Sequence, residues 1–180
     1  MKKVLVLPGW MTSLELYESD DGFDVCIGEL DGISFAADYV VGVSLGALIV
    51  LRETPRIHGK IILINPPLPK RNILAWFFRW ISYVSHEGLF LQRQRFTRNP
   101  LLFCREFSRC ISLLEIDFSE TFDSAPAGKI TVIRGKNDRF FCDDQADHFL
   151  RSKHIEVAEI EGGHNWCSEI ETLLRSRLGG

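Results

Sequence analysis

The chain has 180 residues, enough for one domain of ordinary size whose single core buries roughly 70% of the surface of the unfolded chain. Hydrophobic residues make up 46% and charged residues 25%, which is average for a globular protein and argues against long disordered regions. The net charge of -3 and the pI near 6.0 exclude a generally basic nucleic-acid-binding protein.

The sequence also bears on membrane insertion, on secretion and on the state of the cysteines. No stretch reaches the roughly 18 uninterrupted apolar residues that span a bilayer, and the apolar run after Lys3 is too short for a signal peptide. We therefore expect no stable membrane insertion. The five cysteines form no Cys-x-x-Cys pair, so neither a disulfide framework nor a zinc site is indicated. These features predict a cytoplasmic protein with free thiols.

Short runs of β-branched and aliphatic residues recur along the chain, and each is followed by turn residues or by a helical pattern. They predict six strands, at 3–7, 23–27, 39–43, 60–65, 130–134 and 155–160. Helical periodicity predicts helices at 45–53, 142–151 and 166–178. This alternation predicts an α/β fold with a doubly wound, mostly parallel sheet of about six strands.

The segment from about 66 to 120 interrupts the alternation. It is rich in aromatic residues, has a helical pattern and begins with Pro66-Pro67-Leu68-Pro69. We expect a helical cap inserted into a single domain that spans residues 1–180. The candidate substrate-binding side chains of this cap are Trp76, Phe77, Arg79 and Trp80.

Charge is divided unevenly between this segment and the rest of the chain. Residues 4–51 contain eight acids and no Lys or Arg. Residues 66–118 contain eight bases and four acids, so this segment carries +4 and the remainder -7. Either a solvated cap face or a docking face for an acidic macromolecule or an anionic substrate would account for this distribution.

Gly42-Val43-Ser44-Leu45-Gly46 lies where the third predicted strand passes into a helix. The pattern is that of a G-x-S-x-G nucleophile elbow, a strained turn that exposes the serine hydroxyl above the sheet. Side chains at positions 42 and 46 would collide with the neighbouring strand and helix, which explains the two glycines. The alternative is a small residue in a tight turn that carries no chemistry.

A serine nucleophile needs a base, and the base needs an orienting group. Asp138 follows the fifth predicted strand and His164 follows the sixth, so both are expected at the carboxyl ends of parallel strands, where open α/β sheets build their sites. Ser44, Asp138 and His164 are therefore the candidate catalytic residues. Asp143 and Asp144 are alternatives to Asp138.

Two backbone N–H groups are candidates for an oxyanion hole. Leu45 begins the helix after the nucleophile, and Trp10 lies in the loop after the first strand. The sequence contains no visible cluster of metal ligands, so we expect neither a metal nor an organic cofactor. Cys167 follows His164 closely but has no second base, which favours a buried thiol over a nucleophile.

Gly42–Gly46, the turn Gly135–Asp138 and the loop Gly162-Gly163-His164 match, in order, the motifs of α/β-hydrolase-fold serine hydrolases. The chain resembles that family over nearly its whole length. The resemblance implies a serine carboxylic ester hydrolase, either an esterase or a thioesterase. Two departures are the Pro8-Gly9 pair, where most relatives have His-Gly, and the expected lack of the usual leading hairpin.

Pro8-Gly9-Trp10 and the elbow also resemble, more weakly, the pimeloyl-acyl-carrier-protein methyl ester esterases of biotin synthesis, which have an Arg-bearing cap. That likeness implies a small-molecule or carrier-bound acyl ester as the substrate, and an acidic carrier protein as a partner at the basic cap. Two other classes stay open: a lyase of the menaquinone-pathway type, and a non-catalytic binding module that retains the fold.

Overall fold

The computed structural model describes residues 2–9, 24–25, 34–86 and 111–179. Its strands are β1 (Val4–Leu7), β2 (Asp24–Val25), β3 (Tyr39–Val43), β4 (Lys60–Ile64), β5 (Ile130–Gly135) and β6 (Glu156–Ile160). Its helices are α1 (Leu45–Glu53), the short 3-10 helix η2 (Thr54–Arg56), α2 (Ile73–His86), α4 (Ser119–Ser124), α5 (Asp144–Ser152) and α6 (Ser168–Gly179). Residues 111–114 are also helical.

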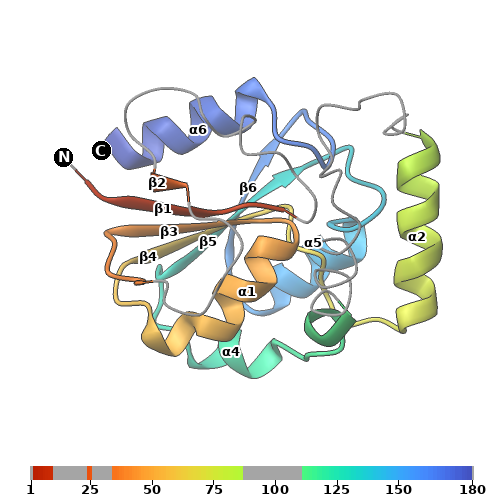
Figure 1. The fold of residues 1–180 in the computed structure, drawn as a ribbon, viewed down its shortest axis with the longest axis horizontal. Helices are drawn as coiled ribbons and strands as arrows, with labels where there is room; N and C mark the ends of the chain where they lie inside the picture. Colours follow the sequence, from red (N-terminus) through yellow and green to blue (C-terminus); the bar gives the residue numbers. More distant parts are fainter. Residues whose placement is uncertain (1, 10–23, 26–33, 87–110, 180) are drawn as a thin grey trace.

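The six strands form one sheet in the order β2-β1-β3-β4-β5-β6, and every neighbouring pair is parallel (Figure 1). The strand order reverses at β1, because β2 and β3 lie on its opposite sides. A reversal of this kind opens a crevice at the carboxyl ends of the strands. The predicted doubly wound parallel sheet is confirmed.

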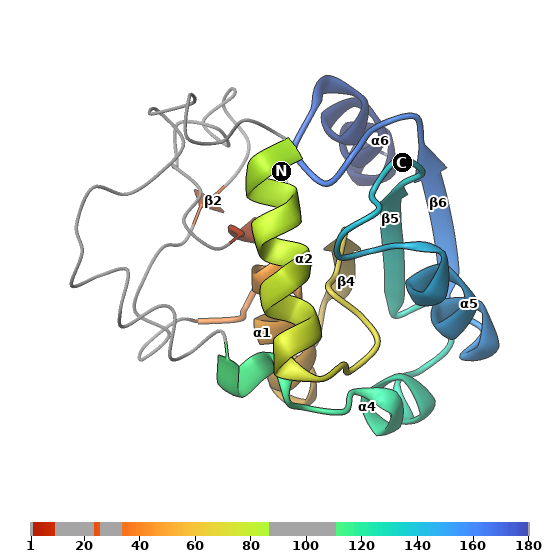
Figure 2. The ribbon, with the colours of Figure 1, turned by 90° about the vertical axis from the view of Figure 1, so that its right-hand side faces the viewer.

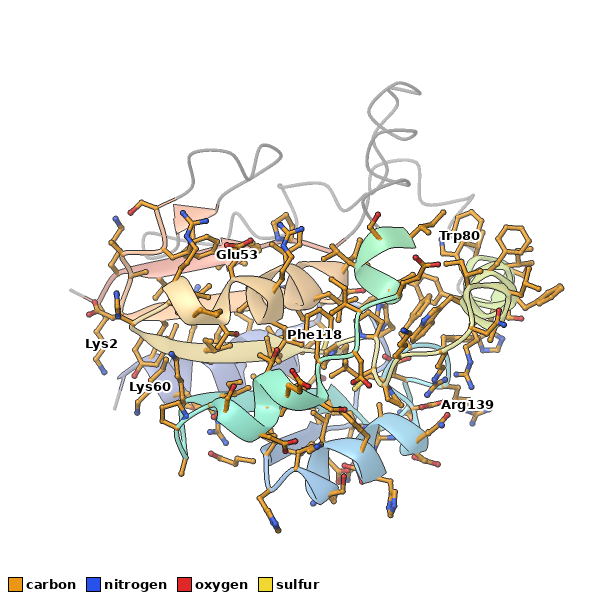
Figure 3. All side chains as sticks on the ribbon, turned by 90° about the horizontal axis from the view of Figure 1, so that it is seen from below. Lys2, Glu53, Lys60, Trp80, Phe118 and Arg139 are labelled. Carbon is orange, nitrogen blue, oxygen red and sulfur yellow. The ribbon has the colours of Figure 1, made fainter. Side chains whose placement is uncertain are left out.

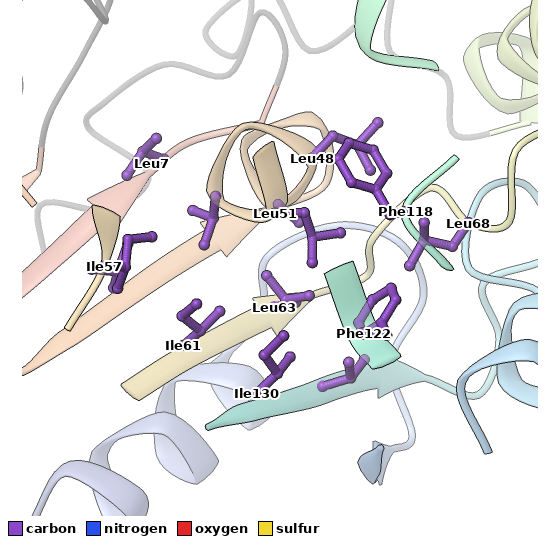
Figure 4. Packing of buried hydrophobic residues seen from close by; sticks show 14 of the residues in the cluster. Leu7, Leu48, Leu51, Ile57, Ile61, Leu63, Leu68, Phe118, Phe122 and Ile130 are labelled. Carbon is purple, nitrogen blue, oxygen red and sulfur yellow. The ribbon is translucent and has the colours of Figure 1, made fainter. Parts of the chain in front are cut away.

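Strands β1, β3 and β4 are buried on both faces along most of their length, which explains why their sequences are almost entirely apolar. In β4, Ile61 and Leu63 belong to the cluster that packs beneath α1, α4 and α5. Ile62 and Ile64 point the other way and belong to the cluster that packs against α6. Figure 4 shows the first of these clusters, where side chains from α1, β4 and α4 converge.

Helix α2 stands apart from these layers, beyond the carboxyl ends of the strands (Figures 1 and 2). Trp80 of α2 and Arg139 of the loop after β5 lie at this end of the molecule, whereas Lys2 and Lys60 lie at the opposite end (Figure 3). Helix α2 therefore faces the edge of the sheet where the sequence places the candidate catalytic residues.

The observed elements differ from the expected ones in a few places. Helix α4 was not predicted, because its six residues are too few to show a helical period; buried Phe122 anchors it to the core. Within the expected cap, residues 87–110 lie outside the described residues, and α2 is the longest described helix there. Within the described ranges, no helix combines the length and hydropathy needed to cross a membrane.

The core on the α1 side makes a direct prediction about stability. Leu51 is fully buried there, so we expect Leu51→Ala to lower the free energy of unfolding by about 2 to 5 kcal/mol through lost contacts and a residual cavity. Leu74→Ala is the matched control, because Leu74 is 63% exposed and its loss should change stability by less than about 0.5 kcal/mol. Urea unfolding of both variants measures the difference, and equal losses would contradict the packing described here.

Candidate active site

Ser44 lies in the sharp turn between β3 and α1, with φ 50° and ψ -117°. A positive φ is uncommon for a residue other than glycine, and it stores strain that the surrounding structure must hold. The backbone N–H of Ser44 donates to the carbonyl of Ile64 at 2.8 Å, which fastens the turn to the end of β4. The turn thus keeps Ser44 at the carboxyl edge of the sheet.

The two elbow glycines are required by close backbone contacts. A Cβ atom on Gly42 would lie 2.6 Å from the Cα of Ala47, inside the first turn of α1. A Cβ atom on Gly46 would lie 2.3 Å from the carbonyl oxygen of Leu7, at the end of β1. Because such contacts involve backbone on both sides, no side chain can be accommodated at either position without moving a strand or a helix.

The structure brings Ser44, His164 and Asp138 into one hydrogen-bonded chain. The Oγ of Ser44 lies 2.8 Å from Nε2 of His164, and Nδ1 of His164 lies 2.6 Å from Oδ2 of Asp138. An ionised carboxylate only accepts hydrogen bonds, so the proton of the neutral imidazole belongs on Nδ1. Nε2 is then left as an acceptor that faces the serine hydroxyl, which is the geometry of a nucleophile beside a base.

The carboxylate of Asp138 is buried and accepts four hydrogen bonds. Oδ1 accepts from the backbone N–H groups of Phe140 and Phe141, and Oδ2 accepts from that of Cys142 and from His164. Burial alone would raise the pKa of Asp138. The attraction of His164 and these hydrogen bonds outweigh burial and hold the pKa of Asp138 below its ordinary value, so the group stays ionised.

Neither of the alternative acids contacts the histidine. Asp143 caps the N-terminus of α5 by accepting from the N–H of Ala146, and it also pairs with two arginines. Asp144 is fully exposed and pairs with Arg134. Of the three acids, the geometry therefore selects Asp138 as the partner of His164.

An apolar cavity of about 300 Å³ adjoins the serine. Its wall comes from the elbow, from α2, from residues 111–114 and from the loop after β5, and is formed by Ser44, Leu45, Pro67, Ile73, Leu74, Trp76, Phe77, Trp80, Ile111, Leu114 and Phe141. Four of the sequence-predicted site residues, Leu45, Trp76, Phe77 and Trp80, are thus brought to the serine. Trp10 lies outside the described residues.

Aromatic rings enclose the imidazole of His164. The ring of Phe141 lies 4.5 Å from it and the ring of Tyr83 lies 5.4 Å from it, measured between centroids. The hydroxyl of Tyr83 donates to the side-chain oxygen of Asn165 at 2.5 Å, which ties α2 to the residue after the histidine. These rings restrict the orientations open to the imidazole and exclude water from one side of it.

Two arginines fasten the start and middle of α2 to the loop after β5. Arg71 and Arg79 both pair with Asp143, at 2.5 Å and 2.8 Å, and Arg79 also donates to the carbonyl of Phe140 at 2.9 Å. The guanidinium of Arg71 lies over the ring of Trp76. Arg79, a predicted substrate-binding residue, is therefore not part of the cavity wall; it secures the helix that carries the wall.

Sequence reasoning missed several residues of this site. Tyr83 and Phe141 were within its reach, because Phe140 and Phe141 closely follow Asp138 and α2 is rich in aromatic residues. Asp143 was considered only as an alternative to Asp138. Asn65 was expected only as the last residue of the fourth strand. Its signal was a polar residue directly after the apolar run Ile61–Ile64, since such a residue is buried and its polar atoms need hydrogen-bond partners.

The remaining chemistry of the described residues gives no rival centre. Among them, no group of three or more His, Cys, Asp and Glu side chains is arranged to hold a metal ion. Burial raises the pKa of the Cys142 thiol well above its ordinary value and, more weakly, that of Cys167. Both thiols therefore stay protonated at neutral pH, a state that disfavours nucleophilic attack.

No protein-family model and no curated protein matches the sequence. Among solved structures, the chain is similar to a carboxylesterase of the thaumarchaeon Nitrososphaera gargenis, with a TM-score of 0.64, 14% identity, and coverage of 99% of this chain and 90% of that chain. It is also similar to the enol-lactonase of Burkholderia xenovorans LB400, with a TM-score of 0.66, 15% identity, and coverage of 99% and 90%.

A third similar structure is MGS-M2, an alpha/beta hydrolase from a Medee basin deep-sea metagenome library. Its TM-score is 0.62 at 15% identity, and the alignment covers 98% of this chain and 88% of that chain. All three likenesses extend over nearly the whole chain. The chain therefore has the α/β-hydrolase fold.

Proposed function

We propose that this protein is a serine hydrolase that cleaves a carboxylic ester or thioester. The observation that supports this most is the hydrogen-bonded chain of Ser44, His164 and Asp138 beside an apolar cavity. The fold agrees with it, because two of the similar structures are named as a carboxylesterase and a lactonase.

In the proposed reaction, Ser44 Oγ bonds to the carbonyl carbon of the substrate while its proton passes to Nε2 of His164. Asp138 keeps the imidazole in the required tautomer and stabilises the imidazolium that forms. The electron pair displaced onto the carbonyl oxygen is stabilised by backbone N–H groups, in this proposal those of Leu45 and Trp10. His164 then protonates the leaving alcohol or thiol, and a water molecule repeats the sequence to release the acid.

The cavity determines which class of acyl group fits. Apart from the serine hydroxyl and backbone groups, its wall is built from aliphatic and aromatic side chains, so burying a hydrocarbon chain there is favourable.

The form of the substrate is suggested by the charge of the cap segment, residues 66–118. Its excess of basic residues supports a carrier-bound acyl ester, with an acidic carrier protein bound at the cap. Five of its eight bases lie outside the described residues, and Arg71 and Arg79 are already paired with Asp143.

The proposed nucleophile can be tested with a fluorophosphonate probe. We expect stoichiometric labelling at Ser44, identified by peptide mass spectrometry, because Nε2 of His164 lies within reach of the serine proton. Ser44→Ala should remove the label, and Asp138→Asn should slow ester hydrolysis by about 10⁴-fold, because the wrong imidazole tautomer then faces the serine.

The control is Ser34→Ala, which removes an exposed hydroxyl that precedes β3, whereas the elbow follows the other end of that strand, so labelling should be unchanged. Folded protein that takes up no label would contradict the proposal and favour a non-catalytic binding module. Elimination product formed without an acyl-enzyme would favour the lyase alternative.

The acyl pocket makes a second prediction. With p-nitrophenyl esters of increasing chain length, each buried methylene contributes about 0.8 kcal/mol, so kcat/KM should rise about fourfold per carbon until the cavity is filled. Leu114→Trp narrows the cavity and should abolish this rise while sparing the acetate ester. The matched control is Glu115→Trp, which adds the same ring at the neighbouring exposed position. If both variants follow the wild-type series, the cavity does not hold the acyl chain.

The buried carboxylate makes a prediction about pH. Because the pKa of Asp138 is lower in the folded protein than in the unfolded chain, its ionised form stabilises the fold at neutral pH. This stabilisation is lost as the pH falls below about 5 and through the folded-state pKa. We expect urea unfolding midpoints to fall over that range, and to fall less steeply in Asp138→Asn.

Asp143 has a pKa lowered in the same direction and contributes over the same range, so part of the slope should persist in Asp138→Asn. Asp123→Asn is the control, because that carboxylate is mostly exposed and its ion pair with Lys153 is screened by solvent. An identical acid slope in wild type and Asp138→Asn would contradict the stated role of the buried charge.

A further inference from the structure

We propose that Asn65 is the positioning residue of this site: its side-chain amide holds the loop that carries Asp138 and the loop that carries His164 at a fixed separation. The inference rests on the proposed function, in which the distance from the imidazole to Ser44 controls the rate. Asn65 follows β4 directly, its side chain is completely buried, and its backbone has φ 46°.

The amide of Asn65 forms three hydrogen bonds, two to the loop that carries His164 and one to the last residue of β5, where the loop that carries Asp138 begins. Nδ2 donates to the carbonyl oxygens of Gly163 and His164, each at 3.0 Å. Oδ1 accepts from the backbone N–H of Gly135 at 2.7 Å, three residues before Asp138. The side chain therefore crosses from β4 over the end of β5 to the loop that follows β6.

Only one orientation of the amide fits these partners. Two carbonyl oxygens require a donor with two protons, and one N–H requires an acceptor, which is what Nδ2 and Oδ1 supply. The flipped amide would place an oxygen against two carbonyls and an NH₂ group against an N–H. An aspartate of the same shape would place a carboxylate oxygen against both carbonyls inside the protein, which is strongly unfavourable.

The backbone conformation further limits which residue types can occupy position 65. With φ 46°, position 65 lies in the left-handed region, which glycine, asparagine and aspartate tolerate best. Glycine has no amide, and aspartate has no donor at this end. Among the residues that suit the backbone, asparagine alone also satisfies all three partners.

A glycine makes the bridge possible. A Cβ atom on Gly135 would lie 2.3 Å from the carbonyl oxygen of Gly163, so the histidine loop passes directly over the backbone at the end of β5. This contact brings the carbonyl of Gly163 within reach of Asn65. Gly135 thus permits the close approach, and the amide of Asn65 fixes it.

The same end of β4 also holds the serine. The carbonyl of Ile64 accepts from the N–H of Ser44 at 2.8 Å, and the N–H of Asn65 donates to the carbonyl of Ile133 in β5 at 2.9 Å. Two consecutive residues therefore contact the segments that carry all three members of the hydrogen-bonded chain. Asn65 is not part of the cavity wall, so it acts on His164 and Asp138 and not on the acyl group.

The experiment compares Asn65→Gly with Asn137→Gly. Asn65→Gly keeps a residue that tolerates positive φ and removes only the amide, so folding should survive. Asn137→Gly is the matched control, because Asn137 also bridges the two loops through a side-chain amide, to the carbonyl of Glu161, but at an exposed position. Asn65→Asp is the second variant, which keeps the shape and loses the donors.

We expect Asn65→Gly and Asn65→Asp to lower kcat for a p-nitrophenyl ester by about 10²-fold with KM within about twofold of wild type, the size of effect that a displaced catalytic group produces. Asn137→Gly should keep both constants within about twofold of wild type. A folded Asn65→Gly variant with unchanged kcat would overturn the proposal, as would a loss confined to KM or an equal loss in Asn137→Gly.

A spectroscopic readout separates this inference from the proposed function. The proton between Nδ1 of His164 and Asp138 should give a downfield ¹H NMR signal, identified by its loss in His164→Ala. We expect the signal in wild type and in Asn137→Gly, and its loss or exchange broadening in Asn65→Gly. If wild type neither labels at Ser44 nor hydrolyses esters, the proposed function fails while this signal still tests Asn65; a signal unchanged in Asn65→Gly overturns the positioning role alone.

Discussion

The site depends on a buried negative charge that the protein must keep satisfied. An unpaired carboxylate in the interior costs several kcal/mol, and Asp138 avoids that cost through three backbone N–H groups and the imidazole of His164. Because the three N–H groups belong to residues 140–142, the loop after β5 curves around the carboxylate of Asp138. The same three hydrogen bonds thus stabilise both the carboxylate and the conformation of the loop.

The conformation of that loop then determines what surrounds the serine. It places Phe141 against both His164 and Trp76, and it brings Asp143 to the N-terminus of α5. There Asp143 pairs with Arg71 and Arg79. Helix α2 is held in this way by the same loop that orients the imidazole. The apolar wall and the proton-transfer groups therefore share one mechanical support, although they come from distant parts of the sequence.

Much of this architecture could be predicted from the sequence, because its signals are local. Continuous apolar runs such as Tyr39–Val43 indicate strands buried on both faces, and glycines at 42 and 46 indicate an elbow. The order of Ser44, Asp138 and His164 along the chain was enough to predict that their side chains lie close together. Asn65 could not be assigned a role in the same way, because its partners follow β5 and β6, and nothing near it in the sequence specifies which loops pass over it. The pairing of Arg79 with Asp143 could not be predicted for a similar reason, since the two residues lie 64 positions apart in the sequence.

The parallel sheet affects the order in which the parts of the site come together during folding. Ser44 and His164 are separated by 120 residues, and the histidine reaches the serine only after β6 has paired with β5 at the edge of the sheet. Contacts between residues as distant in the sequence as Ser44 and His164 form late and slowly in folding. In the proposed mechanism, the elbow would therefore form before the base that activates its serine is in place. Pairing of β6 with β5 would then be the step that places the proposed base beside the serine.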